Sequence, residues 1–138
     1  MLLIKTRVLP SPIHGMGLFA AQHVPAGTPI WRFFPGFDQD YSPREFAQLP
    51  EPARSHTQWF SFVSKDSSHR ILSGDHACFM NHSPSPNTGA PAKAISPFTT
   101  VALREVQEGE EITCNYFEFD ADAEQKLGCN VNPPVLAP

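Results

Sequence analysis

Three short segments of the chain contain residues whose types and spacing could do chemistry. The first is Gly15-Met16-Gly17, in which two glycines flank one residue near the N-terminus. Glycines at this spacing allow the main chain to turn sharply and to approach a ligand closely. The third glycine and the following helix of a dinucleotide-binding fingerprint are missing, so the segment does not predict a Rossmann site.

The second and third segments place polar groups in a loop and at the end of a strand. The second runs from Phe79 to Asn87 and contains an Asn-His-Ser sequence in a proline-rich loop. Such a loop makes few regular hydrogen bonds of its own, which leaves its polar groups available. The third runs from Gly109 to Tyr116 and predicts a turn followed by a strand that ends in tyrosine. Each segment alone predicts no more than an ordinary turn.

In this order, the three segments resemble the motifs of the SET domain, a family of protein-lysine methyltransferases. The family's first motif is Gly-x-Gly, which Gly15 and Gly17 match. Its second motif reads Arg-Phe-x-Asn-His-Ser-Cys-x-Pro-Asn and is matched by Phe79, Asn81, His82, Ser83, Pro86 and Asn87. Its third motif reads Gly-Glu-Glu-Leu-Thr-Phe-Asp-Tyr and is matched by Gly109, Glu110, Glu111, Thr113 and Tyr116. The resemblance extends from Leu2 to Phe119.

The resemblance implies a fold class. The expected domain is mostly β, a SET-domain β-clip with a C-terminal pseudoknot and one or two short helices in the middle. This domain is expected over residues 1–120, and residues 121–138 are expected to form a C-terminal tail that is partly ordered at best. The pseudoknot, an uncommon exception to unthreaded topology, would bring Asn81, His82 and Tyr116 close to the Gly-x-Gly turn.

The resemblance also implies an activity. The expected reaction transfers a methyl group from S-adenosyl-L-methionine to the side-chain amine of a lysine in a protein substrate, a histone or another protein. Tyr116 is the expected catalytic residue. Cys114 and Phe117 are expected to line the channel that receives the substrate lysine. The residues expected to bind the cofactor are His14, Gly15, Met16, Gly17, Asn81 and His82.

The chemistry explains why such a site needs a dry channel and a hydroxyl group. A lysine amine has an ordinary pKa near 10.4, so about one in a thousand is neutral at pH 7, and only the neutral form can attack. Burial in a channel and the positive charge of the cofactor both favour the neutral amine. The Tyr116 hydroxyl is expected to orient the amine rather than to remove its proton, because a phenol is mostly protonated at neutral pH.

Several positions depart from the family motifs. Cys114 occupies a position that is usually aromatic and limits how many methyl groups fit, so di- or trimethylation is expected to be allowed. Pro84 replaces the motif cysteine that joins a zinc cluster, and the tail has only Cys129, so no structural zinc is predicted. Cys78 replaces an arginine, and Asn115 replaces an aspartate.

These motifs must be positioned by short elements, because the chain's 15 prolines are spread along its length and disfavour long helices and central strands. A helix is predicted to start at Ser42, which precedes a proline and forms a capping box with Glu45. A second helix is predicted from Pro52 to Phe62. Strands are predicted at Leu2–Leu9, Leu18–Ala21, Thr28–Phe34, His69–Leu72, Pro91–Ser96, Thr99–Leu103 and Glu111–Asn115.

The remaining segments have weaker patterns. His82–Pro91 is rich in proline and small polar residues and is predicted to be a loop. Val131–Pro138 is predicted to be disordered. Trp31 and Trp59 are expected to pack in the core or on the surface rather than to line the channel.

Composition and charge limit the classes of function. The chain has 138 residues, which suits one domain, and its net charge is −4 without a run of lysine and arginine. This argues against nucleic acid as a partner, because phosphate binding needs a clustered basic surface. No apolar stretch approaches the ~20 residues that span a bilayer, so no membrane partner is predicted. Three widely spaced cysteines predict reduced thiols and an intracellular, cytoplasmic protein. The sequence leaves the oligomeric state, monomer or homodimer, undetermined.

Two other functions remain open from the sequence alone. His76, Cys78 and His82 are close enough in sequence to share a metal ion, and Asp75 could add an oxygen ligand, although the spacing fits no standard zinc pattern. A SET-like fold could also serve as a non-catalytic protein-binding module, because fold does not determine function. Elemental analysis would detect the metal, and cofactor binding would separate the enzyme from the binding module.

Overall fold

The largest sheet contains segments from the beginning, middle and end of the chain. The computed structural model describes residues 1–93 and 98–128, and within them this sheet has the strand order β1-β2-β10-β7. Its strands are β1 (Thr6–Pro10), β2 (Met16–Ala20), β10 (Glu111–Cys114) and β7 (Asn81–His82). β1 and β2 form an antiparallel hairpin that places Val8 opposite Leu18.

Two three-stranded sheets complete the β structure. One has the order β3-β9-β8 and consists of Pro29–Arg32, Thr99–Ala102 and Thr88–Gly89. The other has the order β4-β6-β5 and consists of Gln39–Tyr41, Arg70–Leu72 and Phe62–Val63. The strands are short, five residues at most in the described part of the chain, as the frequent prolines predict.

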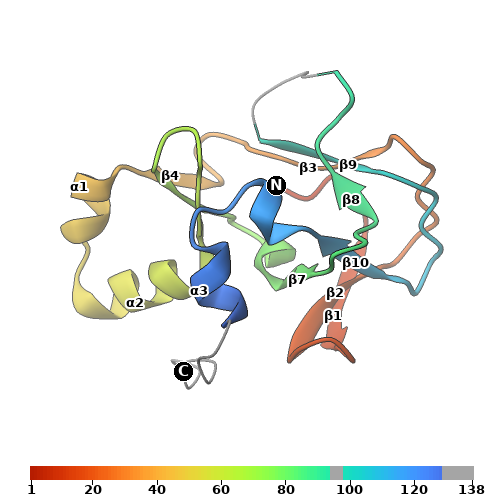
Figure 1. The fold of residues 1–138 in the computed structure, drawn as a ribbon, viewed down its shortest axis with the longest axis horizontal. Coiled ribbons are helices and arrows are strands. Elements are labelled where there is room, and N and C mark those ends of the chain that lie inside the picture. Colours follow the sequence, from red (N-terminus) through yellow and green to blue (C-terminus); the bar gives the residue numbers. More distant parts are fainter. Residues whose placement is uncertain (94–97, 129–138) are drawn as a thin grey trace.

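Helices α1 (Pro43–Ala47) and α2 (Glu51–Phe60) lie together at one side of the molecule, away from the four-stranded sheet (Figure 1). The predicted start of α1 is confirmed. Ser42 Oγ accepts a hydrogen bond from the Glu45 N–H, and the Glu45 carboxylate accepts one from the Ser42 N–H. α2 ends at Phe60, two residues earlier than predicted, because Phe62 belongs to strand β5.

Three more short helical segments adjoin the strands of the largest sheet or follow them. The 3-10 helices η1 (His76–Phe79) and η2 (Tyr116–Glu118) lie just before β7 and just after β10. Helix α3 (Ala123–Leu127), which the sequence patterns did not predict, begins at the buried Ala123. No helix in residues 1–93 and 98–128 is long and apolar enough to cross a membrane.

Strand β10 brings distant parts of the chain together. It pairs antiparallel with β2, which places Ile112 opposite Leu18. It also pairs parallel with β7, which places Thr113 opposite Asn81. The C-terminal segment therefore lies inside the sheet, between an N-terminal and a central segment. The predicted class, a mostly β fold with short helices in the middle, is confirmed.

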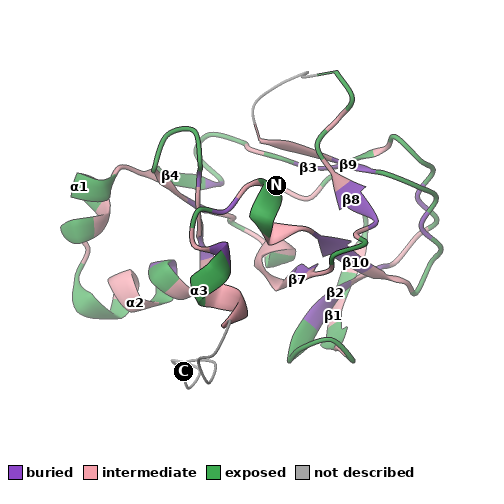
Figure 2. Cartoon of the chain, in the orientation of Figure 1, coloured by how far each residue is buried: buried purple, intermediate pink, exposed green. Residues whose placement is uncertain are grey.

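The residues of the core come from the four-stranded sheet, the β3-β9-β8 sheet and the segments that connect them, and buried stretches are visible on β2, β8 and β10 (Figure 2). Its centre consists of five fully buried aliphatic side chains, Leu18, Val24, Ile30, Val106 and Ile112. Burial of one aliphatic side chain of this size stabilises a fold by about 1.5–3 kcal/mol. Because two of these side chains come from β2 and β10, the same packing that stabilises the core also fixes the strands next to the motifs.

Two sequence predictions were wrong in detail. The first strand begins at Thr6 rather than at Leu2, which instead makes an isolated bridge with Trp31. The loop predicted over His82–Pro91 contains strand β8, whose Thr88 is fully buried. β8 forms because it pairs with the distant strand β9, a contact that no local pattern reveals.

Two further predictions lie partly or wholly outside the described residues. Of the strand predicted at Pro91–Ser96, residues 91–93 form no strand, and residues 94–96 are outside the described part. The prediction of disorder over Val131–Pro138 is also outside it. The division into a domain over residues 1–120 and a tail over residues 121–138 remains a prediction, and α3 lies at the start of that tail.

Candidate functional site

Glu111 connects the three sequence motifs. Its carboxylate accepts hydrogen bonds from Ser11 Oγ at 2.7 and 2.9 Å and from Asn81 Nδ2 at 2.9 Å. It also lies against Gly17, where a β-carbon would collide with Glu111 Oε1. Because β10 pairs with β2 and β7, this residue of the third motif reaches residues of the other two. We call Ser11, Gly17, Asn81 and Glu111 the motif junction.

The Gly-x-Gly turn is fixed to the motif junction through its main chain. Asn81 Nδ2 donates to the carbonyl oxygens of His14 at 3.1 Å and Met16 at 3.2 Å. Gly15 has φ of +47°, in the left-handed region that favours glycine, and no atom lies within 4 Å of the position of a β-carbon there. The two glycines therefore have different roles, since Gly17 makes room for Glu111 and Gly15 provides an exposed turn.

Asn87, the last residue of the second motif, fixes strand β10. Its side chain is buried, its Nδ2 donates to the Glu111 carbonyl at 2.8 Å, and its Oδ1 accepts from the Thr113 N–H at 2.9 Å. The neighbouring Thr88 Oγ1 donates to the Thr113 carbonyl at 2.7 Å. These bonds set the position of β10 and hence of Tyr116, which follows it.

Tyr116 joins the second motif to the third. Its hydroxyl donates to the Met80 carbonyl at 2.6 Å, and its main-chain N–H donates to His82 Nδ1 at 3.2 Å. Because Nδ1 accepts this bond, the neutral His82 ring carries its proton on Nε2. Burial, with smaller effects of nearby acidic groups, raises the pKa of the Tyr116 hydroxyl well above its ordinary value, so the phenol stays protonated at neutral pH.

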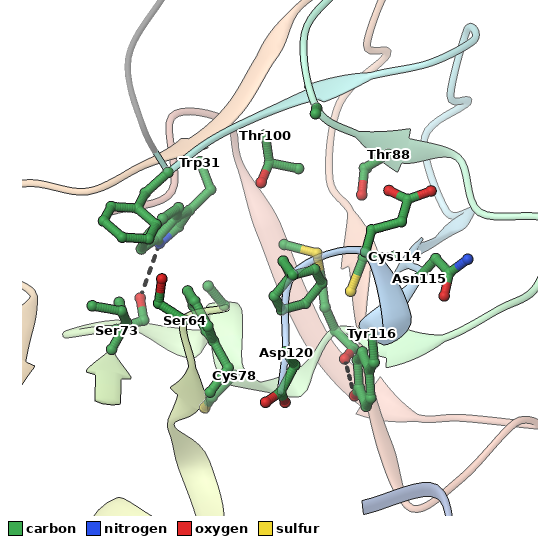
Figure 3. Close-up of a pocket in the computed structure, with 18 of the residues that line it drawn as sticks. Trp31, Ser64, Ser73, Cys78, Thr88, Thr100, Cys114, Asn115, Tyr116 and Asp120 are labelled. Atoms are coloured by element: carbon green, nitrogen blue, oxygen red, sulfur yellow. Dashed lines mark hydrogen bonds between the residues drawn. The ribbon is translucent and has the colours of Figure 1, made fainter. Parts of the chain in front are cut away.

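A cavity of about 390 Å³ opens beside Tyr116. Its wall includes Trp31, Cys78, Met80 and Cys114. Figure 3 shows Tyr116 and Cys114 toward one side of the cavity, Trp31 with Ser73 toward the other, and Asp120 between them. A hydrogen bond of 3.1 Å from Trp31 Nε1 to Ser73 Oγ fixes the indole ring. A largely apolar wall with a few oriented polar groups is typical of a ligand site.

The two cysteine side chains at this cavity are neutral thiols. Burial raises the pKa of Cys78 to about 11 and that of Cys114 to about 12. Both side chains therefore stay protonated at neutral pH, and a protonated thiol is a poor nucleophile. Cys114 contributes its small volume and low polarity to the cavity wall.

Two oppositely charged side chains also face this cavity. Asp120 is almost fully buried, and its Oδ2 lies 2.6 Å from Lys126 Nζ. Lys126 Nζ also donates to the Ser61 carbonyl at 2.6 Å and lies 5.9 Å from the centroid of the Tyr116 ring. A cation is therefore already present beside the phenol.

The structure separates the site residues predicted from sequence into two groups. Cys114 and Tyr116 line the cavity. Phe117 does not line it, since its side chain is exposed and its ring lies edge-on against His82 with centroids 5.6 Å apart. The residues predicted to bind a cofactor adjoin the motif junction and do not line the cavity, and they are His14, Gly15, Met16, Gly17, Asn81 and His82.

Sequence reasoning missed four residues of this region. Glu111 was matched to a motif, but its contact with Gly17 depends on strand register and was not predicted. Trp31 was expected to pack in the core or on the surface, and it is buried in the core, but its indole also lines the cavity, which was not predicted. Asp120 and Lys126 follow the last motif in a segment with no recognisable pattern, so no sequence signal could have identified them.

The positions of the side chains do not support the metal site that the sequence left open. Among residues 1–93 and 98–128, no three His, Cys, Asp or Glu side chains lie close enough to hold a metal ion. Asp75, His76, Cys78 and His82 therefore form no metal site. Asp75 Oδ1 instead accepts from the Ala77 N–H at the start of η1.

Both the sequence and the fold are similar to known proteins. The model of the SET domain family matches residues 15–117. A Plasmodium falciparum protein assigned as a histone methyltransferase has a similar structure, with a TM-score of 0.52 and 16% identity, covering 83% of this chain and 95% of that one. A humanized mutant of the Chaetomium thermophilum Polycomb Repressive Complex 2, bound to the inhibitor GSK126, matches with a TM-score of 0.63 and 19% identity. That match covers 88% of this chain but 16% of the other.

Proposed function

The chain belongs to the SET-domain family, and from this premise we propose that it transfers a methyl group from S-adenosyl-L-methionine to the side-chain amine of a lysine in a protein substrate. The position of Tyr116 carries the proposal. Its hydroxyl is held 2.6 Å from the Met80 carbonyl at the cavity wall, while its main chain is bonded to His82 of the second motif. One residue thus connects the proposed cofactor side with a cavity that could receive an amine.

The Gly-x-Gly turn, which is held by the motif junction, fits the cofactor through the exposed main chain around Gly15. The Gly15 turn is open on its outer side, and Asn81 holds the carbonyls on either side of it in place. A nucleotide-like ligand can approach such a glycine turn closely. We therefore assign cofactor binding to His14, Gly15, Met16, Gly17, Asn81 and His82. Bound there, S-adenosyl-L-methionine would supply a methyl group attached to a positively charged sulfur. The sulfur becomes a neutral thioether when the methyl group is transferred, so it is a good leaving group.

The cavity would prepare the acceptor amine. A lysine side chain entering between apolar walls loses water, which disfavours its charged form and increases the fraction that can attack. The Tyr116 phenol, which stays protonated, can then orient the neutral amine through its hydroxyl oxygen. Alignment of this kind can contribute several kcal/mol, up to about 7–11, to lowering a barrier.

Cys114 would determine how many methyl groups fit. It is buried and lines the cavity at a position where a larger aromatic side chain would reduce the space. We propose that the enzyme forms di- or trimethyl-lysine. Exhaustive reaction followed by mass spectrometry should show these products, and a product that stops at monomethyl-lysine would contradict this part of the proposal.

The substrate class is a protein with an accessible lysine, either a histone or another protein. The Plasmodium falciparum protein with a similar fold is assigned as a histone methyltransferase, which supports a histone as the first substrate to test. We further propose an intracellular, cytoplasmic protein without structural zinc, in which residues 1–120 form the catalytic domain.

Calorimetric titration with S-adenosyl-L-methionine and S-adenosylhomocysteine tests the proposal most directly. We expect one-to-one binding with a micromolar dissociation constant, followed by methylation of lysine peptides on an array. Folded protein that binds neither compound and methylates no peptide would instead support a non-catalytic binding module.

The Tyr116→Phe variant tests the role of the hydroxyl. We expect kcat to fall by about 100-fold or more, as when one oriented polar group is removed from a transition state. Cofactor affinity should change little. Tyr41→Phe is a matched control, because Tyr41 is the only other tyrosine of the chain and does not line the cavity. Equal activity of the two variants would remove Tyr116 from the mechanism.

A further inference from the structure

We infer that Lys126 is an internal occupant of the substrate cavity and that a substrate lysine must displace it to reach Tyr116. The inference rests on the proposed function, since it concerns how access to that same cavity is regulated. It makes α3 an autoinhibitory element that competes with substrate for one cation site.

The surroundings of the Lys126 ammonium carry this inference. Nζ donates to Asp120 Oδ2 and to the Ser61 carbonyl, each at 2.6 Å, and lies 5.9 Å from the centre of the Tyr116 ring. A carboxylate, a carbonyl and an aromatic face are groups that recognise an alkylammonium ion. A substrate lysine would enter the cavity as the same ammonium on the same four-carbon stem, and it would lose its proton only beside the positive charge of the cofactor.

The cation site is built without help from Lys126. Asp120 Oδ1 accepts from the main-chain N–H groups of Val63 at 3.1 Å and Asp122 at 3.0 Å, which fixes the carboxylate. The Asp120 side chain is 1% exposed, and Ser61 is also buried. Since an unpaired carboxylate at such burial is costly, the site requires some cation, but nothing in its geometry requires that the cation be Lys126.

The other charged groups that line the cavity do not supply this cation. Lys65 Nζ is hydrogen-bonded to the carbonyl of Phe117 rather than to Asp120. Asp66 and Glu118 are acidic and exposed. Lys126 is thus the basic side chain that neutralises Asp120 among the described residues.

Helix α3 can release Lys126 more easily than the core could release a residue. The helix has five residues, and its N-terminal cap residue, Asp122, makes no side-chain capping bond. A helix this short is marginal without tertiary contacts. The Lys126 side chain is 27% exposed, so it has a path to solvent. If the closed state holds nine-tenths of the molecules, the apparent affinity of a competing amine is reduced about tenfold.

Binding of n-butylammonium chloride tests the inference. This probe reproduces the end of a lysine side chain, and n-butanol is its neutral control. Calorimetry without cofactor should show at least tenfold tighter binding to Lys126→Ala than to the unmodified protein. The double variant Lys126→Ala/Asp120→Asn should lose that gain, and n-butanol should not distinguish the proteins. Equal affinity of the probe for the unmodified protein and Lys126→Ala would overturn the inference.

Amide hydrogen exchange of the unmodified protein provides a second test, which does not depend on whether the Lys126→Ala variant folds. Saturating n-butylammonium should speed amide exchange within residues 123–127 by at least threefold, because the probe binds only when Lys126 has left. Unchanged or slower exchange with bound probe would overturn the inference. Neither measurement uses S-adenosyl-L-methionine, so a protein that binds no cofactor could still show amine competition, and the two proposals fail separately.

Discussion

Glu111 and Asp120 are two carboxylates that hold the site together with different kinds of partner. Glu111 accepts hydrogen bonds from neutral groups, Ser11 Oγ and Asn81 Nδ2. Asp120 also accepts from neutral main-chain N–H groups through Oδ1, but its Oδ2 accepts from a cation, Lys126, on a five-residue helix. The first set of partners is attached to the strands of the largest sheet, whereas the second lies at the end of a flexible side chain.

This difference indicates which half of the site, the motif junction around Glu111 or the cavity around Asp120, can exchange its hydrogen-bond partners. Neutral donors in the sheet (Asn81) or directly after one of its strands (Ser11) hold the motif junction wherever the fold is intact, so this half is permanent. An ammonium ion can be replaced by another ammonium ion of similar shape, so the cavity half is exchangeable. The four predictions below test this contrast, beginning with the largest expected effect.

Loss of the Glu111 carboxylate should cause the largest loss of stability. We expect Glu111→Ala to lower the free energy of unfolding by about 3 kcal/mol, since two partly buried donors lose a charged acceptor. Urea unfolding would measure it. The control is Glu110→Ala, whose partners, the Arg104 side chain and the Gln107 main-chain N–H, are exposed, so that its loss should cost less than about 1 kcal/mol. Equal losses of stability in the two variants would show that Glu111 in the motif junction contributes no more to stability than an exposed glutamate.

Of the two glycines of the first motif, Gly17, which lies against Glu111, should be the more costly to replace. We expect Gly17→Ala to cost about 2 kcal/mol, because its β-carbon would displace the Glu111 carboxylate from its hydrogen bonds. Gly15→Ala should cost about 1 kcal/mol, for strain at positive φ alone. Thermal unfolding of both variants would measure the difference. The reverse order would show that the Glu111 side chain adapts freely.

Alkaline pH should weaken the cavity half. Burial raises the pKa of Cys114 to about 12, above that of an unfolded thiol. The stability that the protonated Cys114 thiol contributes is therefore fully present below about pH 9, and it is lost as the pH rises toward the pKa of Cys114 in the folded protein. Between about pH 9 and pH 10 we expect a loss on the order of 1 kcal/mol from this group. Urea unfolding at several pH values should show a shallower slope for Cys114→Ala, and an identical slope would contradict the prediction.

Salt should produce the smallest effect. The Lys126–Asp120 pair has one partly exposed partner, so raising NaCl from about 0.05 M to about 1 M should cost only ~0.5 kcal/mol of stability. The salt dependence should decrease in Lys126→Met, which keeps the apolar stem and lacks the charge. It should persist in Ser11→Ala, which removes a neutral partner at the junction. A salt effect of equal size in both variants would exclude the ion pair as its source.

Local sequence patterns predicted the elements that are stabilised by contacts between residues close in the sequence. The capping box of Ser42 and Glu45 lies within one turn, so the start of α1 was visible in the sequence. Strand β8 was not visible in the sequence, because Thr88 is buried by tertiary contacts, namely its pairing with β9 and its hydrogen bond to Thr113 of β10. Helix α3 was missed for a similar reason. Its five residues carry no periodic pattern, and it forms where Ala123 is buried and Lys126 reaches Asp120.

The site shows the same limit. The motifs identified Tyr116 and Asn81 from residue type and spacing, through resemblance to a family. They could not reveal that Gly17 is needed for Glu111, since this contact depends on the register between β2 and β10. They also could not reveal Lys126, because its position depends on how the chain returns to the cavity after the last motif.

The insertion of β10 between β2 and β7 also sets the order in which the protein can be assembled. The hydrogen bond between Ser11 and Glu111 joins residues 100 positions apart. Pairings of such long sequence separation form slowly, because loop entropy is lost before the contacts are gained. On the ribosome, the N-terminal hairpin must therefore wait with one edge of β2 unpaired until Glu111 has emerged. The site is completed last, so a nascent chain acquires it only after nearly all of the fold has been synthesised.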